Sequence, residues 1–253
     1  MLAVLSPAKK LDFSAAPEGV PMTEPRFLDD TAELVGVLRG KSVSELAGLM
    51  SLSDNLATLN HERYATFDLD SDPDAERKQA VLAFAGDTYV GLDAPSLTAE
   101  DLAYADGHLR ILSGLYGVLR PTDLIQPHRL EMGTKLATDR GDRLYAFWGP
   151  KIAERLSEDL GDDRVLLNLA SVEYASSIDR DALDARVITP KFMEVRDGTP
   201  KVISFVAKKS RGAMARWMLQ ERPGVDDLTS FDVGGYAFDE SFSSEDEPAF
   251  IRS

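Results

Sequence analysis

The 253-residue sequence contains no cysteine, which excludes disulfide bonds, cysteine nucleophiles, iron–sulfur clusters and zinc ribbons. Its three histidines, His61, His108 and His128, lie far apart, and none belongs to a Glu-x-x-His pair. Metal sites need several such ligands at short spacing. The sequence therefore predicts no metal site and no cofactor, and its lack of cysteine is typical of a reducing compartment.

Long hydrophobic runs are missing as well. The first apolar run, Leu2–Leu5, has no basic region before it and no cleavage pattern after it, so we expect neither a signal peptide nor a membrane span. We predict a cytoplasmic protein with no membrane partner. The sequence also lacks the glycine-rich nucleotide loops, the G-x-S-x-G elbow and the H-E-x-x-H pair of common enzyme classes.

Positive charge is in the minority, with 28 Lys and Arg against 43 Asp and Glu and a formal net charge of −15. A negative mean field repels phosphate, which argues against a protein that coats nucleic acid without selectivity. A local basic cleft remains compatible with this charge. The positions of the cations therefore matter more than their number.

The apolar pattern predicts an α/β (α+β-like) fold, with one domain over residues 1–253 and a mixed sheet flanked by helices. An Asp197-Gly198 pair between two β-rich runs predicts a hairpin with a loop lengthened by Thr199-Pro200, and this hairpin makes the sheet mixed. The acidic, serine-rich stretch 239–247 predicts a mobile surface segment within the C-terminal residues 239–253. The expected strands cover residues 2–5, 80–84, 109–112, 165–170, 186–195 and 201–206. The main expected helices cover residues 28–38 and 144–160. A further helix is expected to start at 98–101, and another to end near 221.

Residues 43–64 predict two short helices, 44–50 and 54–64, joined only by Ser51, Leu52 and Ser53. The stretch 49–57 resembles a helix-hairpin-helix DNA-binding motif, in which backbone amides at the start of the second helix approach a phosphate. The two glycine positions of that motif are Ser51 and Ser53 here, although only glycine takes positive φ without cost. A plain helical hairpin that packs its leucines into the core is the alternative interpretation.

Polar side chains follow several expected strands. Ligands settle at the carboxyl ends of strands in open α/β sheets, so these side chains predict a cationic cleft for a phosphate-bearing ligand. Alternatively, each group pairs locally with the plentiful carboxylates. The groups are Ser6, Lys9 and Lys10; Arg120, His128, Arg129 and Glu131; Ser171 and Glu173; and Lys208, Lys209 and Arg211, with Arg216 further along the last helix.

Five stretches in one order resemble the YaaA family of bacterial peroxide-stress proteins. They are LSPAKKLDF, HLRILSGLYGVLRPTDLIQPHRLEMG, LYAFWG, NLASVEY and ISFVAKKSRGAMARW, and together they span nearly the whole chain. His128 stands where the family commonly has a tyrosine. The resemblance implies an α/β fold with a helix-hairpin-helix element at Leu49 to Ala57 and a cleft formed by Lys9, Lys10, Arg129, Glu131, Lys208, Lys209 and Arg211.

The resemblance also implies DNA binding and a role in limiting damage from iron and hydrogen peroxide. Our first hypothesis is therefore a DNA-binding protein of peroxide stress, with double-stranded or locally unpaired DNA as the partner. The candidate phosphate contacts are Lys9, Lys10, Ser51, Ser53, Arg120, Arg129, Lys208, Lys209, Arg211 and Arg216.

A second hypothesis is an enzyme that acts on a nucleotide, nucleobase or damaged DNA, or on a small phosphorylated ligand. In it Lys9 or Lys208 serves as nucleophile or phosphate clamp, and Glu131 or Glu173 serves as acid or base. A third hypothesis, direct iron sequestration, ranks lowest because ligands are lacking.

Overall fold

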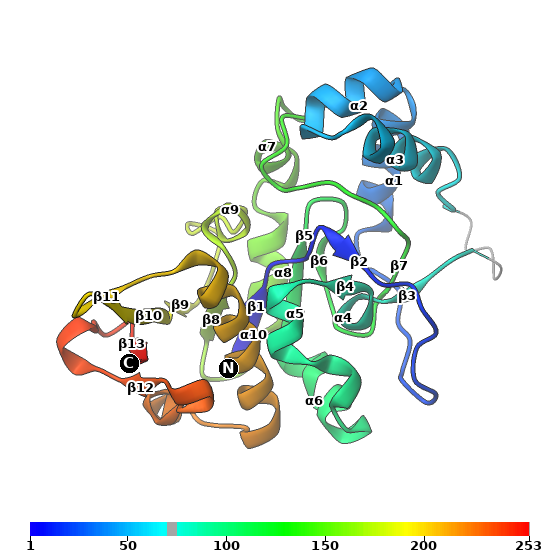
Figure 1. Ribbon diagram of the computed structural model, residues 1–253. Helices are drawn as coiled ribbons and strands as arrows, with labels where there is room; N and C mark the ends of the chain where they lie inside the picture. Colours follow the sequence, from blue (N-terminus) through cyan, green and yellow to red (C-terminus); the bar gives the residue numbers. More distant parts are fainter. Residues whose placement is uncertain (70–74, 253) are drawn as a thin grey trace.

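The computed structural model describes residues 1–69 and 75–252 and has a mixed main sheet (Figure 1). Its strand order is β6 (Gly117–Leu119), β5 (Leu109–Ser113), β1 (Leu2–Leu5), β8 (Val165–Leu169) and β9 (Arg186–Ile188). β1 pairs in parallel with β5 and β8, and β8 pairs in parallel with β9, whereas β6 runs antiparallel to β5. The predicted α/β class and mixed sheet are confirmed.

The central strands are buried along their whole length because helices pack on the sheet. Every residue of β1 and β5 is buried. The long helix α10 (Ser204–Glu221) contacts β1 and β8, and α6 (Ala99–His108) contacts β1 and β5. A capping box between Thr98 and Asp101 fixes the start of α6, as the sequence predicted. Among the helices of residues 1–69 and 75–252, none combines the length and the apolar character needed to cross a bilayer.

A second sheet has the strand order β11 (Thr199–Lys201), β10 (Lys191–Arg196), β13 (Ala249–Arg252), β12 (Ala237–Phe238). The predicted hairpin exists, but its loop is only Asp197-Gly198, both at positive φ, and Thr199-Pro200 are already in β11. The expected strand 186–195 is divided between the two sheets as β9 and β10. The mixed character of the main sheet therefore comes from β6 and not from this hairpin.

Three other local predictions are wrong. Residues 80–84, expected as a strand, form α4 (Ala80–Ala83) followed by β4 (Phe84–Ala85). Periodicity alone does not separate a short buried helix from a buried strand. The expected helix 144–160 is divided into α7 (Leu144–Trp148) and α8 (Lys151–Asp159), since Gly149 adopts φ +48° before Pro150. The expected strand 201–206 is replaced by the end of β11 and the start of α10.

The acidic C-terminal stretch is folded and contributes to the second sheet. Residues 240–242 form a 3-10 turn, η4 (Glu240–Phe242), and Ser244 pairs with Glu247. Glu247 lies 2.7 Å from the ammonium of Lys191, and Asp246 lies 2.7 Å from the Arg186 guanidinium. These ion pairs and the adjacent β13 connect the stretch to the rest of the fold, and its mobility stays a prediction.

The predicted helical hairpin is present as α2 (Val43–Met50) and α3 (Asp54–Ala65), beside α1 (Leu28–Arg39), which confirms the expected helix 28–38. The remaining short elements are β2 (Lys10–Leu11), β3 (Lys78–Gln79), α5 (Asp87–Leu92), η1 (Ala94–Ser96), β7 (Leu124–Ile125), α9 (Val172–Ala175), η2 (Asp226–Ser230) and η3 (Val233–Gly235).

Candidate functional site

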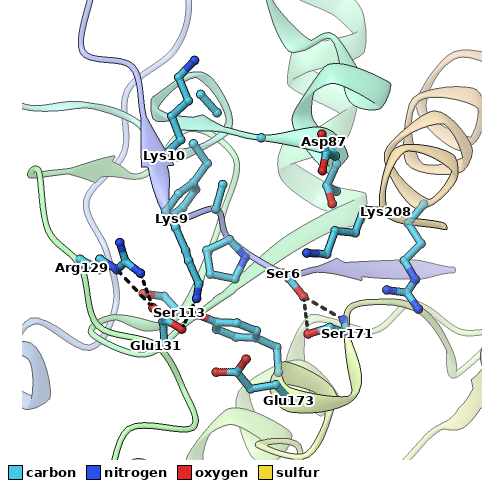
Figure 2. Close-up of a pocket in the computed structure, with 18 of the residues that line it drawn as sticks. Ser6, Lys9, Lys10, Asp87, Ser113, Arg129, Glu131, Ser171, Glu173 and Lys208 are labelled. Carbon is cyan, nitrogen blue, oxygen red and sulfur yellow. Dashed lines mark hydrogen bonds and ion pairs between the residues drawn. The ribbon is translucent and has the colours of Figure 1, made fainter. Parts of the chain in front are cut away.

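A cavity of about 500 Å³ opens beyond the carboxyl ends of β1 and β8 (Figure 2). It is lined by the residues after β1, by the loop between β7 and α7, by the start of α9, and by one face of α10. The lining side chains that carry polar or charged groups are Ser6, Lys9, Lys10, Asp87, Thr88, Ser113, His128, Arg129, Glu131, Ser171, Glu173, Tyr174, Lys208 and Arg211.

Glu131 lies between two cations in this cavity (Figure 2). Its Oε2 is 2.7 Å from Lys9 Nζ, and its Oε1 accepts hydrogen bonds from Arg129 Nε and Nη2 at 3.2 and 3.0 Å. The local pairing that the sequence allowed for Arg129 and Glu131 is therefore present. It occurs inside the cavity, so the same three residues form part of its wall.

Lys208 and Arg211 supply positive charge without a protein partner. Within residues 1–69 and 75–252, neither side chain forms a hydrogen bond or an ion pair with another side chain or with the backbone. Burial lowers the pKa of the Arg211 guanidinium, which nonetheless remains charged at neutral pH because arginine starts from a very high value. The two cations can accept an anionic ligand.

Two glycines, Gly91 and Gly212, allow the helices α5 and α10 to pack closely, and this contact fixes the position of the two cations. α5 and α10 pack so closely that a Cβ on Gly212 would lie 1.7 Å from the carbonyl oxygen of Thr88. A Cβ on Gly91 would lie 2.0 Å from the carbonyl oxygen of Lys209. Both helices contribute residues to the cavity wall, so the crossing fixes how Lys208 and Arg211 face α5.

Three tyrosines fix the backbone of the cavity wall. The hydroxyl of Tyr89 donates to the carbonyl of Ser6 at 3.1 Å, and that of Tyr145 donates to the carbonyl of Glu173 at 2.9 Å. Tyr64 in α3 donates to the carbonyl of Arg129 at 2.6 Å. Burial raises the pKa of Tyr64 and of Tyr89, so both phenols keep their protons and remain donors.

Glu173 and a pair of serines complete the opposite wall. Glu173 Oε1 accepts the backbone N–H of Gly133 at 2.9 Å. Its other oxygen has no hydrogen-bond partner in the described part of the chain, and the carboxylate points into the cavity (Figure 2). The Ser6 hydroxyl accepts the backbone N–H of Ser171 at 2.8 Å and donates to the Ser171 hydroxyl at 3.2 Å.

Several predicted binding residues lie outside the cavity. Arg120 is paired with the buried Asp123 at 2.9 Å, and Arg216 donates to the carbonyls of Leu92 and Asp93, so both are structural. Lys209 is exposed beside the cavity but does not line it. The sequence analysis placed Lys208 and Arg211 directly after a strand. In the structure they lie instead in the second and third turns of α10.

Ser51 and Ser53 occupy the turn of the helical hairpin, away from the cavity wall. Both are exposed, and Ser51 adopts the left-handed conformation with φ +51°, the backbone state that glycine would take more easily. The hairpin geometry is thus kept without glycine.

The sequence analysis missed Asp87, Thr88 and Ser113, which also line the cavity. Asp87 and Thr88 come shortly after the apolar run 80–84, which was predicted as a strand. Polar residues after a predicted strand were the signal that could have identified these two as cavity residues. Within residues 1–69 and 75–252, no group of three or more His, Asp or Glu side chains is arranged to hold a metal ion.

His128 is buried at the base of the cavity, where its ring lies edge-on to Tyr116, with centroids 5.2 Å apart. Burial lowers the pKa of His128 to about 4. The folded state therefore keeps a neutral imidazole where the unfolded chain takes up a proton near its ordinary pKa of 6.5. This difference destabilises the protein as the pH falls below 6.5.

As the pH falls from about 6.5 to about 4, we expect the free energy of unfolding to decrease by up to about 3 kcal/mol because of His128. Urea unfolding of the wild type and of His128→Tyr across this range measures it. The stability of the wild type relative to the variant should decrease steadily as the pH falls. Parallel pH profiles for the two proteins would contradict a buried, neutral His128.

The fold and the cavity together define an α/β protein with a cavity at the carboxyl ends of parallel strands, and cations and carboxylates line the wall of that cavity. The model of the family described as "Peroxide stress protein YaaA" matches residues 1–242, and the chain belongs to this family. An oxidative-stress role follows from this membership.

Similar proteins are found in Burkholderia species. UPF0246 proteins of Burkholderia mallei (strain SAVP1), Burkholderia pseudomallei (strain K96243) and Burkholderia thailandensis are each 52% identical over 257 residues. Each match covers 100% of this chain and 98% of the relative. The resemblance noted in the sequence is confirmed.

Proposed function

We propose that this protein binds DNA during peroxide stress and that the cavity receives a locally unpaired, phosphate-bearing nucleotide. The observation that carries the proposal is the position of Lys208 and Arg211 in the wall of a cavity at the sheet edge, where neither has a partner within residues 1–69 and 75–252. Guanidinium and ammonium groups are the side chains that bind phosphate in proteins.

The mixed charge of the cavity wall favours one nucleotide over a duplex backbone. Glu131 and Glu173 line the same cavity as the cations, and the net charge of the chain is −15. A regular duplex backbone presents only negative charge along its length and would meet these carboxylates. A single nucleotide offers its phosphate to the cations and its base N–H or sugar hydroxyl groups to Glu173. The cavity volume, about 500 Å³, falls in the range of small-ligand sites.

The helical hairpin supports contact with a longer strand. Tyr64 of α3 donates to the carbonyl of Arg129, so the hairpin is joined by a hydrogen bond to the loop that carries a cavity residue. In this proposal the Ser51–Ser53 turn, at the other end of α3 and about 15 Å from Tyr64, meets the sugar-phosphate backbone at a distance from the nucleotide in the cavity. Lys9, Lys10 and Arg129 line the cavity mouth and contribute to the local positive field.

We expect Lys208→Ala combined with Arg211→Ala to weaken binding to DNA with unpaired nucleotides by at least about tenfold and to lower its salt dependence. The measurement is a titration of labelled single-stranded, bubble and duplex DNA at two salt concentrations. The matched control is Lys201→Ala with Arg180→Ala, which removes the same charge from exposed positions outside the cavity. Equal losses in the two double variants would show that only net charge matters and would overturn the cavity assignment.

A catalytic role is the second candidate, and the arrangement around Glu131 favours it. A carboxylate held by Lys9 and Arg129 faces the same space as Glu173, whose second oxygen is free within the described residues. Two carboxylates and a free lysine, Lys208, can supply an acid, a base and a nucleophile or phosphate clamp. The same titrations, followed on a denaturing gel, decide this point: a shortened or altered strand would show an enzyme, and an intact one would support binding alone.

A further inference from the structure

Phe205 is an aromatic side chain that the fold leaves in solvent next to the cavity. It is the second residue of α10 and is 64% exposed, although large apolar side chains of this fold are mostly buried. Lys208, which lines the cavity, follows it by three residues, so the two side chains lie on one face of the helix, one turn apart. Gly212, one further turn along the same face, packs against α5.

A second apolar side chain lies at the cavity mouth. Val172, the first residue of α9, lines the cavity and is 82% exposed. Apolar groups thus occur on two separate elements: Val172 of α9 in the cavity lining, and Phe205 of α10 one turn from the cavity residue Lys208. A site that binds only phosphate needs no apolar side chains beside its cations. A nucleotide, in contrast, carries a base with a flat apolar face as well as a phosphate.

We propose that Phe205 stacks on a nucleobase when the neighbouring phosphate is held by Lys208 and Arg211. This inference rests on the proposed function and names the ligand chemistry more closely: a nucleotide with its base, rather than a bare phosphate or a phosphorylated sugar. A phenyl ring stacks on any base because every base has a π face, so this contact contributes affinity without selecting a sequence. Phe205 lies beside the cation pair and carries no charge, so its contribution is independent of salt.

The test compares Phe205→Ala with Phe242→Ala, which removes an equally large, 43% exposed ring from the distant η4 turn. Phe205→Ala should weaken binding of single-stranded DNA about tenfold with an unchanged salt slope, and Phe242→Ala should leave binding unchanged. Phe205→Trp should restore binding, and its fluorescence should be quenched by a DNA strand with bases but not by an otherwise identical abasic strand.

The outcomes separate this inference from the function on which it rests. If the Lys208 and Arg211 double variant loses binding while Phe205→Ala and Phe242→Ala behave alike, the stacking role is overturned and the cationic site stands. Equal quenching of Phe205→Trp by the abasic strand would also overturn it. If the wild type binds none of the DNA probes, both proposals fail together.

Discussion

Gly212→Ala is expected to destabilise the protein by about 3 kcal/mol or more, since the new methyl group has no space. Its Cβ would lie 1.7 Å from the carbonyl oxygen of Thr88 and 2.8 Å from the backbone nitrogen of Leu92. Both atoms belong to the backbone of α5, so no side chain can move aside and the two helices must separate. This separation also moves Lys208 and Arg211 away from α5 in the cavity wall.

Urea unfolding and DNA titration of the same variant measure these two effects. Gly36→Ala is the matched control, because Gly36 lies inside α1 with nothing within 4 Å of an added Cβ. There alanine should stabilise the helix by about 0.5 to 1 kcal/mol. A Gly212→Ala variant as stable as Gly36→Ala would show that α5 and α10 do not cross at this distance.

Asp159→Ala is expected to destabilise the protein by about 3 to 5 kcal/mol, because it leaves a buried guanidinium without its counter-charge. Asp159 Oδ2 accepts from Arg110 Nε at 2.7 Å, and the Arg110 side chain is buried in the central strand β5. Asp159 Oδ1 also pairs with Arg26 at 3.2 Å and with Arg155. One carboxylate at the end of α8 thus forms ion pairs with three arginines.

Glu158→Ala provides the control from the adjacent residue. Glu158 pairs with Arg155 at 2.7 Å but is exposed, so its removal should change the free energy of unfolding by at most about 1 kcal/mol. Replacing both members of the buried pair, as Asp159→Leu with Arg110→Met, should recover part of the loss, because the buried guanidinium of Arg110 is then gone, Arg155 keeps Glu158 and Arg26 is partly exposed to solvent. Equal effects of Asp159→Ala and Glu158→Ala would contradict a buried ionic role.

The order of the main elements could be predicted because each depends on local pattern. The apolar runs of β1, β5 and β8 and the capping box before α6 are visible in the sequence, and all four are present. Two of the failures share one cause. Residues 80–84 and 201–206 are short apolar runs whose state depends on partners from elsewhere in the chain, as when Pro121 and Asp123 accept the amides of Val81 and Ala80.

The candidate site could be predicted in part. Polar residues after β1 and β8 and in the loop of Arg129 and Glu131 meet in one cavity, because carboxyl ends of parallel strands share one edge. Arg120 and Arg216 were equally good candidates for phosphate binding in the sequence. In the structure Arg120 forms an ion pair with Asp123, and Arg216 donates hydrogen bonds to backbone carbonyls at the end of α5. The sequence shows the chemical type of a charged residue, but only the three-dimensional structure shows which group it pairs with.

The sequence by itself determined the α/β class, the absence of cysteine chemistry, the main strands and the family, since these depend on composition, periodicity and motif order. Only the tertiary structure decided which cations have no partner among the described residues. Lys208 and Arg211 face the cavity because Gly91 and Gly212 let α5 and α10 approach, and that approach joins residues more than a hundred positions apart. Local pattern carries no information on such a distance, because it is set by the packing of the whole chain.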